Sequence, residues 1–214
     1  HASIPLDEDG KLKEVEIILG TKCSGKDLMY NIGMLIRSAF QSDSTPEERN
    51  YAIDYFLYLW CGPDSPLFDK SKMATFERYF IEDKETHVEE KGNYFKLRDN
   101  EQIVDNILDA FDVVGDNRHI INGHVPVKLG QGESPIRAGG RLLVIDGGLS
   151  RAYQPVTGIA GYTLIFTSHE LNLVAHQPFE STAAAISAEQ DIHSVQSLVK
   201  QMPRRLLIDD TDEG

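Results

Sequence analysis

The stretch from His119 to Ala160 carries the side chains that are best suited to chemistry in this sequence. One apolar run ends at Asn122-Gly123-His124, and a second ends at Asp146-Gly147-Gly148. Both runs are typical of buried strands that stop on glycine beside a polar group. A strand end holds such a group in place while the glycine lets backbone and ligand approach closely. The stretch is therefore predicted to form half of an active site. The alternative is a hairpin whose glycines only make turns and whose His124 is a core histidine.

Histidine and carboxylate side chains form the first candidate site. His1 and His124, assisted by Asp146 or Asn122, offer neutral imidazoles and oxygen ligands that suit divalent first-row metals. Two histidines alone cannot complete a two-metal centre, which also needs bridging and terminal carboxylates. The sequence contains no GDxxDRG or GNHE segment that would supply them. It therefore offers only part of a metal site.

Cationic side chains form the second candidate site, because they could bind phosphate oxygens through charge-assisted hydrogen bonds: Arg78, Lys84, Arg137 and Arg151. Each of them could equally be an ordinary surface cation. A third hypothesis pairs Ser150 or Cys61 with a histidine as a nucleophile, but neither has the surrounding spacing that such enzymes use. His176 is interpreted as structural, with a place lining a site as the alternative.

The overall charge limits the classes of partner. The 214 residues include 34 acidic and 21 basic side chains, giving a formal charge of −13. This balance argues against nucleic acid and against an anionic membrane surface, although a local cationic patch could still bind a phosphorylated substrate. No apolar run approaches the roughly 18 residues of a membrane span, and the start lacks a signal-peptide pattern. With only two cysteines, far apart, we expect reduced thiols and a cytoplasmic location.

The elements that must position these groups fall into two regions. The first region combines extended pieces before residue 19 with helices, and its signals are a Thr45-Pro46 capping box and an Asn100 N-cap. The helix after the capping box is expected to bury Ala52, Tyr55, Phe56, Leu59 and Trp60. The second region has short strands, with Tyr162–Thr167 and Leu171–Ala175 predicted as a hairpin. Two polar helices are expected last, at Thr182–Ala188 and Asp191–Lys200. This order predicts an α+β fold with mostly antiparallel strands and a helical insertion.

Several segments resemble the class III fructose-1,6-bisphosphatases of bacteria, a family of calcineurin-like metallophosphoesterases, along nearly the whole chain: RHIINGHVPV, GESPIRAGGRLLVIDGGLSRAYQ, TGIAGYTLIF, LVAHQPFES, YLWCGPDSPLF and MATFERYFIEDKETH. By this resemblance His1 fits the fourth metal motif and Gly123-His124 the fifth. The first three motifs would precede residue 1, and the parent chain would continue past Asp212. Ala2-Ser3 departs from the small pair usual after the fourth-motif histidine, and His1 could instead be a tag remnant.

The resemblance also implies a fold and an activity. Residues 1–19 and 118–181 would form the C-terminal half of an αββα sandwich, 20–117 a helical insertion, and 182–214 a truncated helical extension. The parent enzyme would hydrolyse the 1-phosphate of fructose 1,6-bisphosphate with two manganese (Mn2+) ions. Its partners would be the sugar-phosphate substrate and the N-terminal half of the same polypeptide, and a homo-oligomer is left open. Asp146 or Asn122 would orient a ligand or face the substrate.

Two alternatives to this function are kept. One is another metallophosphoesterase, acting on phosphoproteins or nucleotides. The other is a non-catalytic regulatory or oligomerisation module. With three of five motifs missing, residues 1–214 alone are expected to be inactive.

Overall fold

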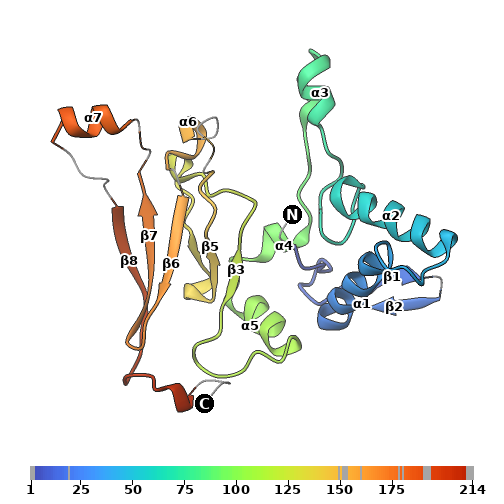
Figure 1. Ribbon diagram of the computed structural model, residues 1–214, viewed down its shortest axis with the longest axis horizontal. Coiled ribbons are helices and arrows are strands. Elements are labelled where there is room, and N and C mark those ends of the chain that lie inside the picture. Colours follow the sequence, from blue (N-terminus) through green and yellow to red (C-terminus); the bar gives the residue numbers. More distant parts are fainter. Residues whose placement is uncertain are drawn as a thin grey trace. The chain divides into compact units, whose positions relative to one another are not determined.

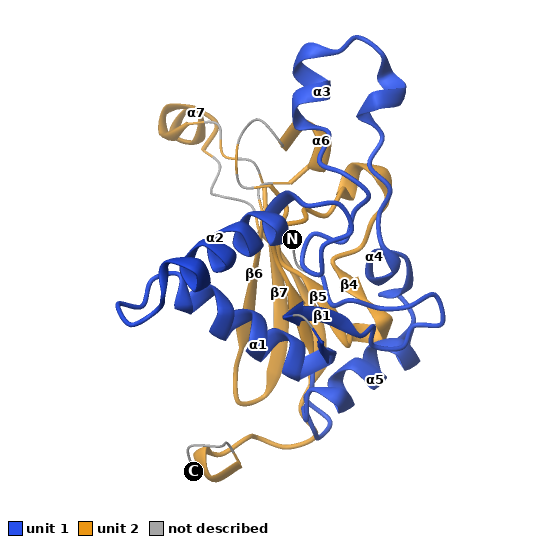
Figure 2. Cartoon of the chain, turned by 90° about the vertical axis from the view of Figure 1, so that its right-hand side faces the viewer, with its two compact units in different colours: residues 1–118 blue, residues 119–214 orange. Residues whose placement is uncertain are grey.

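The computed structural model describes residues 3–18, 20–148, 150, 154–159, 161–177, 179, 181–189 and 194–210. The chain divides into two compact units, residues 1–118 and 119–214, coloured separately in Figure 2. Described residues 3–18 therefore belong to the helical unit, whereas their assignment to the sheet of residues 118–181 stays a prediction.

Unit 1 combines a small β-hairpin with helices, one of which, Thr75–Phe80, projects away from the others (Figure 1). Its strands are β1 (Val15–Ile18) and β2 (Thr21–Cys23), which pair antiparallel. Its helices are α1 (Gly25–Ser38), α2 (Pro46–Cys61), α3 (Thr75–Phe80), α4 (Asn93–Leu97) and α5 (Glu101–Ala110), with a 3-10 turn at Lys84–His87. Apolar side chains from β1, α1 and α2 form one core cluster: Ile17, Leu28, Ile32, Tyr55 and Leu59.

The predicted helix starts in unit 1 are confirmed. Thr45 Oγ1 accepts the Glu48 N–H at 3.2 Å, and Glu48 Oε2 accepts the Thr45 N–H at 2.9 Å, which is the reciprocal capping box. Asn100 caps α5 by accepting the N–H groups of Gln102 and Ile103. Each cap satisfies N–H groups that a helix leaves without intrahelical partners.

The buried face of α2 is narrower than its sequence indicates. Ala52, Tyr55 and Leu59 are buried as expected, but Phe56 and Trp60 are 51% and 59% exposed. At 100° per residue these two aromatics lie further round the helix than the stripe that contacts α1 and β1. The expectation that they are buried is therefore wrong for this chain.

Unit 2 contains two three-stranded sheets. The first has the order β3-β5-β4, from β3 (Ile120–Asn122), β4 (Ile136–Arg137) and β5 (Leu142–Val144). The second has the order β6-β7-β8, from β6 (Gly161–Phe166), β7 (Glu170–His176) and β8 (Ser194–Gln201), which lie side by side in both ribbon views. Short helices occur at Gln154–Thr157 (α6) and Thr182–Ser187 (α7), with 3-10 turns at Leu129–Gln131, Ala138–Gly140 and Ile208–Asp210.

The end of unit 2 differs from expectation. The hairpin is confirmed as β6 and β7, but the second polar helix, expected over Asp191–Lys200, is strand β8 across its described residues. β8 pairs antiparallel with β7 from His176↔Ser194 to Glu170↔Gln201. Its valines favour a strand, and the pairing supplies backbone partners that the polar sequence pattern does not reveal.

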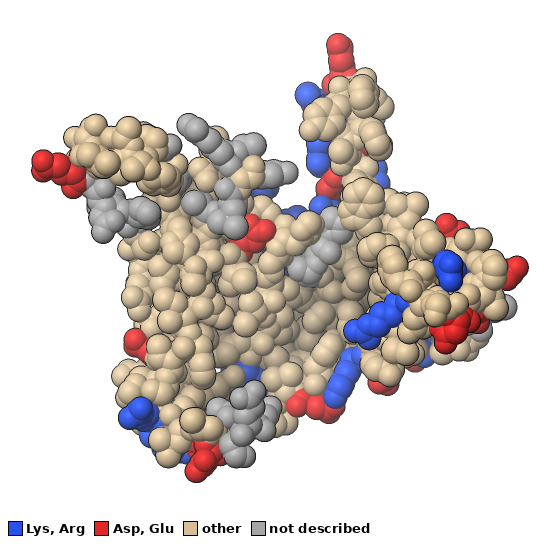
Figure 3. All heavy atoms as spheres, in the orientation of Figure 1, with Lys and Arg blue, Asp and Glu red and all other residues tan. Residues whose placement is uncertain are grey.

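Among the strand pairs described, β3–β5 is parallel and the others are antiparallel. Together with the helices, these sheets make the chain a mixed α/β protein. None of the helices described is long and apolar enough to cross a membrane. On the face drawn in Figure 3, both the Lys and Arg atoms and the Asp and Glu atoms are scattered among other residues.

Candidate active site

The parallel pairing of β3 with β5 builds the candidate site. Asn122 pairs with Val144, so both strands end at the same edge of the sheet. The Ile145 N–H donates to the Asn122 carbonyl at 2.8 Å, and the Val127 N–H donates to the Asp146 carbonyl at 2.8 Å. These bonds tie together the two loops that follow the strands. The two glycine-rich strand ends singled out in the sequence are therefore neighbours.

His124 is held at the exposed tip of its loop in a strained conformation. Its φ is +64°, in the left-handed region. The Val125 N–H donates to the Gly123 carbonyl at 2.7 Å, a three-residue γ-turn centred on His124. A left-handed conformation costs a residue with a side chain about 1–3 kcal/mol, and such strain concentrates at functional sites. The exposure of the side chain argues against the core-histidine alternative.

Asp146 closes a turn in which one glycine has no room for a side chain. Asp146 Oδ1 accepts the Gly148 N–H at 2.7 Å. A Cβ on Gly147 would lie 2.9 Å from Gly161 Cα and 2.8 Å from a methyl group of Ile159. The chain therefore passes too close at this point for any residue except glycine. This close packing fixes where the Asp146 carboxylate is presented.

Asn122 is the last residue of β3 and is buried, with 8% of its surface exposed. Buried amides form hydrogen bonds, because an unsatisfied polar group inside a protein is costly. Its position suits a residue that orients the loop of His124.

Arg137 is placed differently from these three residues. Its backbone pairs with Leu142 at the amino end of β5, whereas Asp146 follows the carboxyl end. Its guanidinium lies 3.5 Å from Glu133 Oε2, and the same oxygen accepts the Lys128 N–H at 3.1 Å. Glu133 was not singled out in the sequence, although its spacing of four residues from Arg137 is a recognisable ion-pair signal. An anion at Arg137 would compete with Glu133.

Arg78 and Lys84 belong to unit 1. Arg78 forms an ion pair at 3.0 Å with Glu89, which also binds Lys70 at 3.0 Å and accepts the Ala74 N–H. Burial alone would raise the pKa of Glu89, but the hydrogen bonds from Ala74 and Lys70 and the charges of Lys70 and Arg78 outweigh it, so the pKa is lowered. Lys84 is exposed at the start of its 3-10 turn. Arg78 thus has a structural partner already.

The remaining candidate residues are His1, Arg151, Cys61, Ser150 and His176. His1 and Arg151 lie outside the described residues. Cys61 Sγ donates to the Leu57 carbonyl, and Ser150 is exposed. His176 contacts Thr163 Oγ1 at 2.7 Å and Ser194 Oγ at 3.3 Å, bonds that link β7 to both neighbouring strands and agree with a structural role.

The donor set at the strand ends fits part of a metal site. His124 supplies an exposed imidazole, and Asp146 supplies a carboxylate. Within the part of the chain that the structure describes, no three His, Cys, Asp or Glu residues gather into a metal-binding group. A metal held here would need further ligands beyond these residues.

Comparison with known proteins defines the class: the chain belongs to the Firmicute fructose-1,6-bisphosphatase family, whose model matches residues 1–214. It is 56% identical over 214 residues to the fructose-1,6-bisphosphatase class 3 of Bacteroides fragilis, 54% identical to that of Phocaeicola vulgatus, and 54% identical over 215 residues to that of Alkaliphilus metalliredigens. Each alignment covers 100% of this chain and 32% of the relative. The chain thus spans about a third of the length of these relatives. No solved structure matches it.

Proposed function

We propose that residues 1–214 are the C-terminal part of a fructose-1,6-bisphosphatase, which removes the 1-phosphate to give fructose 6-phosphate and phosphate. The observation that carries this proposal is the strained, exposed His124 beside the Asp146 turn, at the shared edge of β3 and β5. The relatives' names suggest the substrate, and the exposure of His124 in the segment that the fifth metallophosphoesterase motif would occupy supports its assignment as a metal ligand.

His124 is proposed as a metal ligand, together with His1 and with carboxylates from outside residues 1–214. Two bound metal ions, manganese in this proposal, would lower the pKa of a water molecule and neutralise phosphate charge. Asn122 and Asp146 are proposed to hold the His124 loop or to face the substrate. Arg137 and Arg151 are proposed to bind phosphate oxygens. Lys84 is proposed to bind phosphate oxygens as well, and Arg78 would do so by exchanging its ion pair with Glu89 for the substrate.

The same proposal includes the wider assignments. The strands of unit 2 would complete an αββα metallophosphoesterase sandwich with the N-terminal part of the polypeptide. The enzyme would act in the cytoplasm, in gluconeogenesis. The helical insertion of residues 20–117, which lies between the two metal motifs in the sequence, would help select a sugar bisphosphate.

Phosphate release by the full-length protein tests the proposal. With manganese present, we expect release from fructose 1,6-bisphosphate to exceed that from a phosphopeptide or a nucleotide by at least about tenfold in kcat/KM, which is about 1.4 kcal/mol of transition-state discrimination. A preference for the phosphopeptide or nucleotide would assign another phosphoesterase. Absence of phosphate release from all three substrates would indicate that the protein is a non-catalytic module.

The isolated chain provides a second test. We expect residues 1–214 alone to show no appreciable turnover, because a two-metal centre needs carboxylates that the site described here does not assemble. Manganese-dependent hydrolysis by this chain alone would contradict the division of the site between two parts of a polypeptide.

A further inference from the structure

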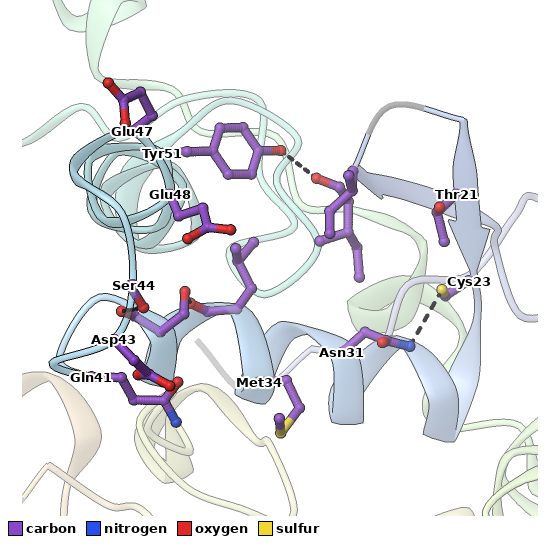
Figure 4. A pocket seen from close by; sticks show the side chains of 14 residues that line it. Thr21, Cys23, Asn31, Met34, Gln41, Asp43, Ser44, Glu47, Glu48 and Tyr51 are labelled. Atoms are coloured by element: carbon purple, nitrogen blue, oxygen red, sulfur yellow. Dashed lines mark hydrogen bonds between the residues drawn. The ribbon is translucent and has the colours of Figure 1, made fainter.

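Unit 1 carries an open groove that the proposed activity does not use. It lies between the β1–β2 hairpin, α1 and the amino-terminal end of α2, and has a volume of about 750 Å³ (Figure 4). We call it the α1–α2 groove. Its lining includes Ile17, Ile18, Met34, Leu35 and Tyr51.

The floor of the α1–α2 groove is apolar and largely uncovered. Ile17 is buried in the core, but Ile18, Met34 and Tyr51 are 56%, 44% and 46% exposed. Each square ångström of apolar surface left in water forgoes about 25 cal/mol of burial energy. Contiguous apolar surface with a polar rim is typical of an interaction site.

One end of the groove is acidic. Figure 4 shows Asp43, Glu47 and Glu48 at this end and Thr21 and Cys23 at the other. Glu48 is committed to the capping box with Thr45. Among the described residues, no Lys or Arg lines the groove and no ion pair uses Asp43 or Glu47. The groove therefore matches an occupant that places a cation beside apolar side chains.

The net charge of this chain and the length of its relatives decide between the possible occupants of the α1–α2 groove. A second copy of a chain with a formal charge of −13 would bring further negative charge to these carboxylates. The class 3 relatives, by contrast, contain a large polypeptide outside the region that matches this chain, which is 32% of their length. We infer that the α1–α2 groove receives a segment of the full-length polypeptide outside residues 1–214, with bulky apolar side chains and a Lys or Arg. This inference does not rest on the phosphatase activity.

Hydroxyl-radical footprinting of the wild-type full-length protein tests whether the groove is covered. The measured quantity is the oxidation rate of Met34, native against urea-unfolded. We expect at least about tenfold protection, approaching that of Met202, which is 6% exposed. Met202 also reports that the protein is folded. Oxidation of Met34 near the unfolded rate, while Met202 stays protected, would overturn the inference.

Photo-crosslinking identifies the occupant. Met34 is replaced by p-benzoylphenylalanine in the full-length protein, and adducts are mapped by mass spectrometry after mixing light and isotope-labelled chains. We expect an intramolecular adduct on a peptide outside residues 1–214 that contains Lys or Arg. An adduct within residues 1–214, a mixed-isotope adduct, or an adducted peptide without a cation would contradict it. Neither experiment measures phosphatase activity, so the inference about the groove and the proposed function can each fail independently of the other.

Discussion

At the scale of single residues, the backbone of His124 is the most informative feature. Its γ-turn places a residue with a side chain in a region of φ that glycine occupies freely. A loop without a function at this position would be more stable with glycine. The sequence places His124 at a strand end, but the left-handed φ depends on how the β3 and β5 loops bond to each other, so it could not be predicted.

The strain at His124 can be measured with two substitutions that remove the same imidazole. We expect His124→Gly to be more stable than His124→Ala by about 1 kcal/mol, because only alanine retains the left-handed penalty. Urea unfolding of the two variants measures this difference. Equal stability, or a more stable alanine variant, would show that the turn is unstrained.

The close approach at Gly147 has a matched control in the neighbouring loop. We expect Gly147→Ala to destabilise the fold by about 1–3 kcal/mol, since the added methyl group meets Gly161 backbone at 2.9 Å. Gly123→Ala should change stability by less than about 1 kcal/mol, because no atom lies within 4 Å of its Cβ position. Thermal unfolding of both variants compares them, and similar losses would argue against the packing described for Asp146.

At the scale of elements, the features that depend on neighbouring residues are predicted well from the sequence. The features that depend on pairing between distant segments are not. The capping box at Thr45, the Asn100 cap and the β6–β7 hairpin each depend on residues that are close together in the sequence. β8 was missed because its strand state depends on β7. The exposed Trp60 was missed because helical periodicity does not say how much of a helix face has a neighbour.

The segment that includes α3 and the 3-10 turn is predicted to depend on pH through Glu89. The folded pKa of Glu89 is lowered, so its contribution is complete above the ordinary glutamate pKa of about 4.3 and is lost as pH falls through the lowered value. We expect Glu89→Gln to weaken this segment by about 1 kcal/mol at pH 7 and to remove that acid dependence. Hydrogen exchange of residues 72–90 measures both effects.

Glu77→Gln is the control for Glu89, because Glu77 lies in α3, within the same segment, and takes part in no ion pair found among the described residues. Its exchange rates and their pH profile should match the wild type. An equal effect of the two substitutions would mean that the Lys70–Glu89–Arg78 contacts do not hold the segment.

At the scale of the whole molecule, the family membership that the quoted segments indicated is confirmed along the entire chain. The class 3 relative from Bacteroides fragilis, 56% identical, extends well beyond the matched region, which is 32% of its length. The roles of all the candidate site residues stay predictions, those of His1, Arg151, Arg78, Lys84 and Arg137 included. The grouping of Asn122, His124 and Asp146 at one sheet edge follows from this chain alone.

The central claim is that His124 is a metal ligand of a sugar-bisphosphate phosphatase. The most direct test is manganese-dependent phosphate release from fructose 1,6-bisphosphate by the full-length protein carrying His124→Ala. We predict a loss of at least about 100-fold in kcat/KM, with weakened manganese affinity and an unchanged circular dichroism spectrum. Wild-type turnover and manganese affinity in that variant would contradict the claim and return His124 to a structural role.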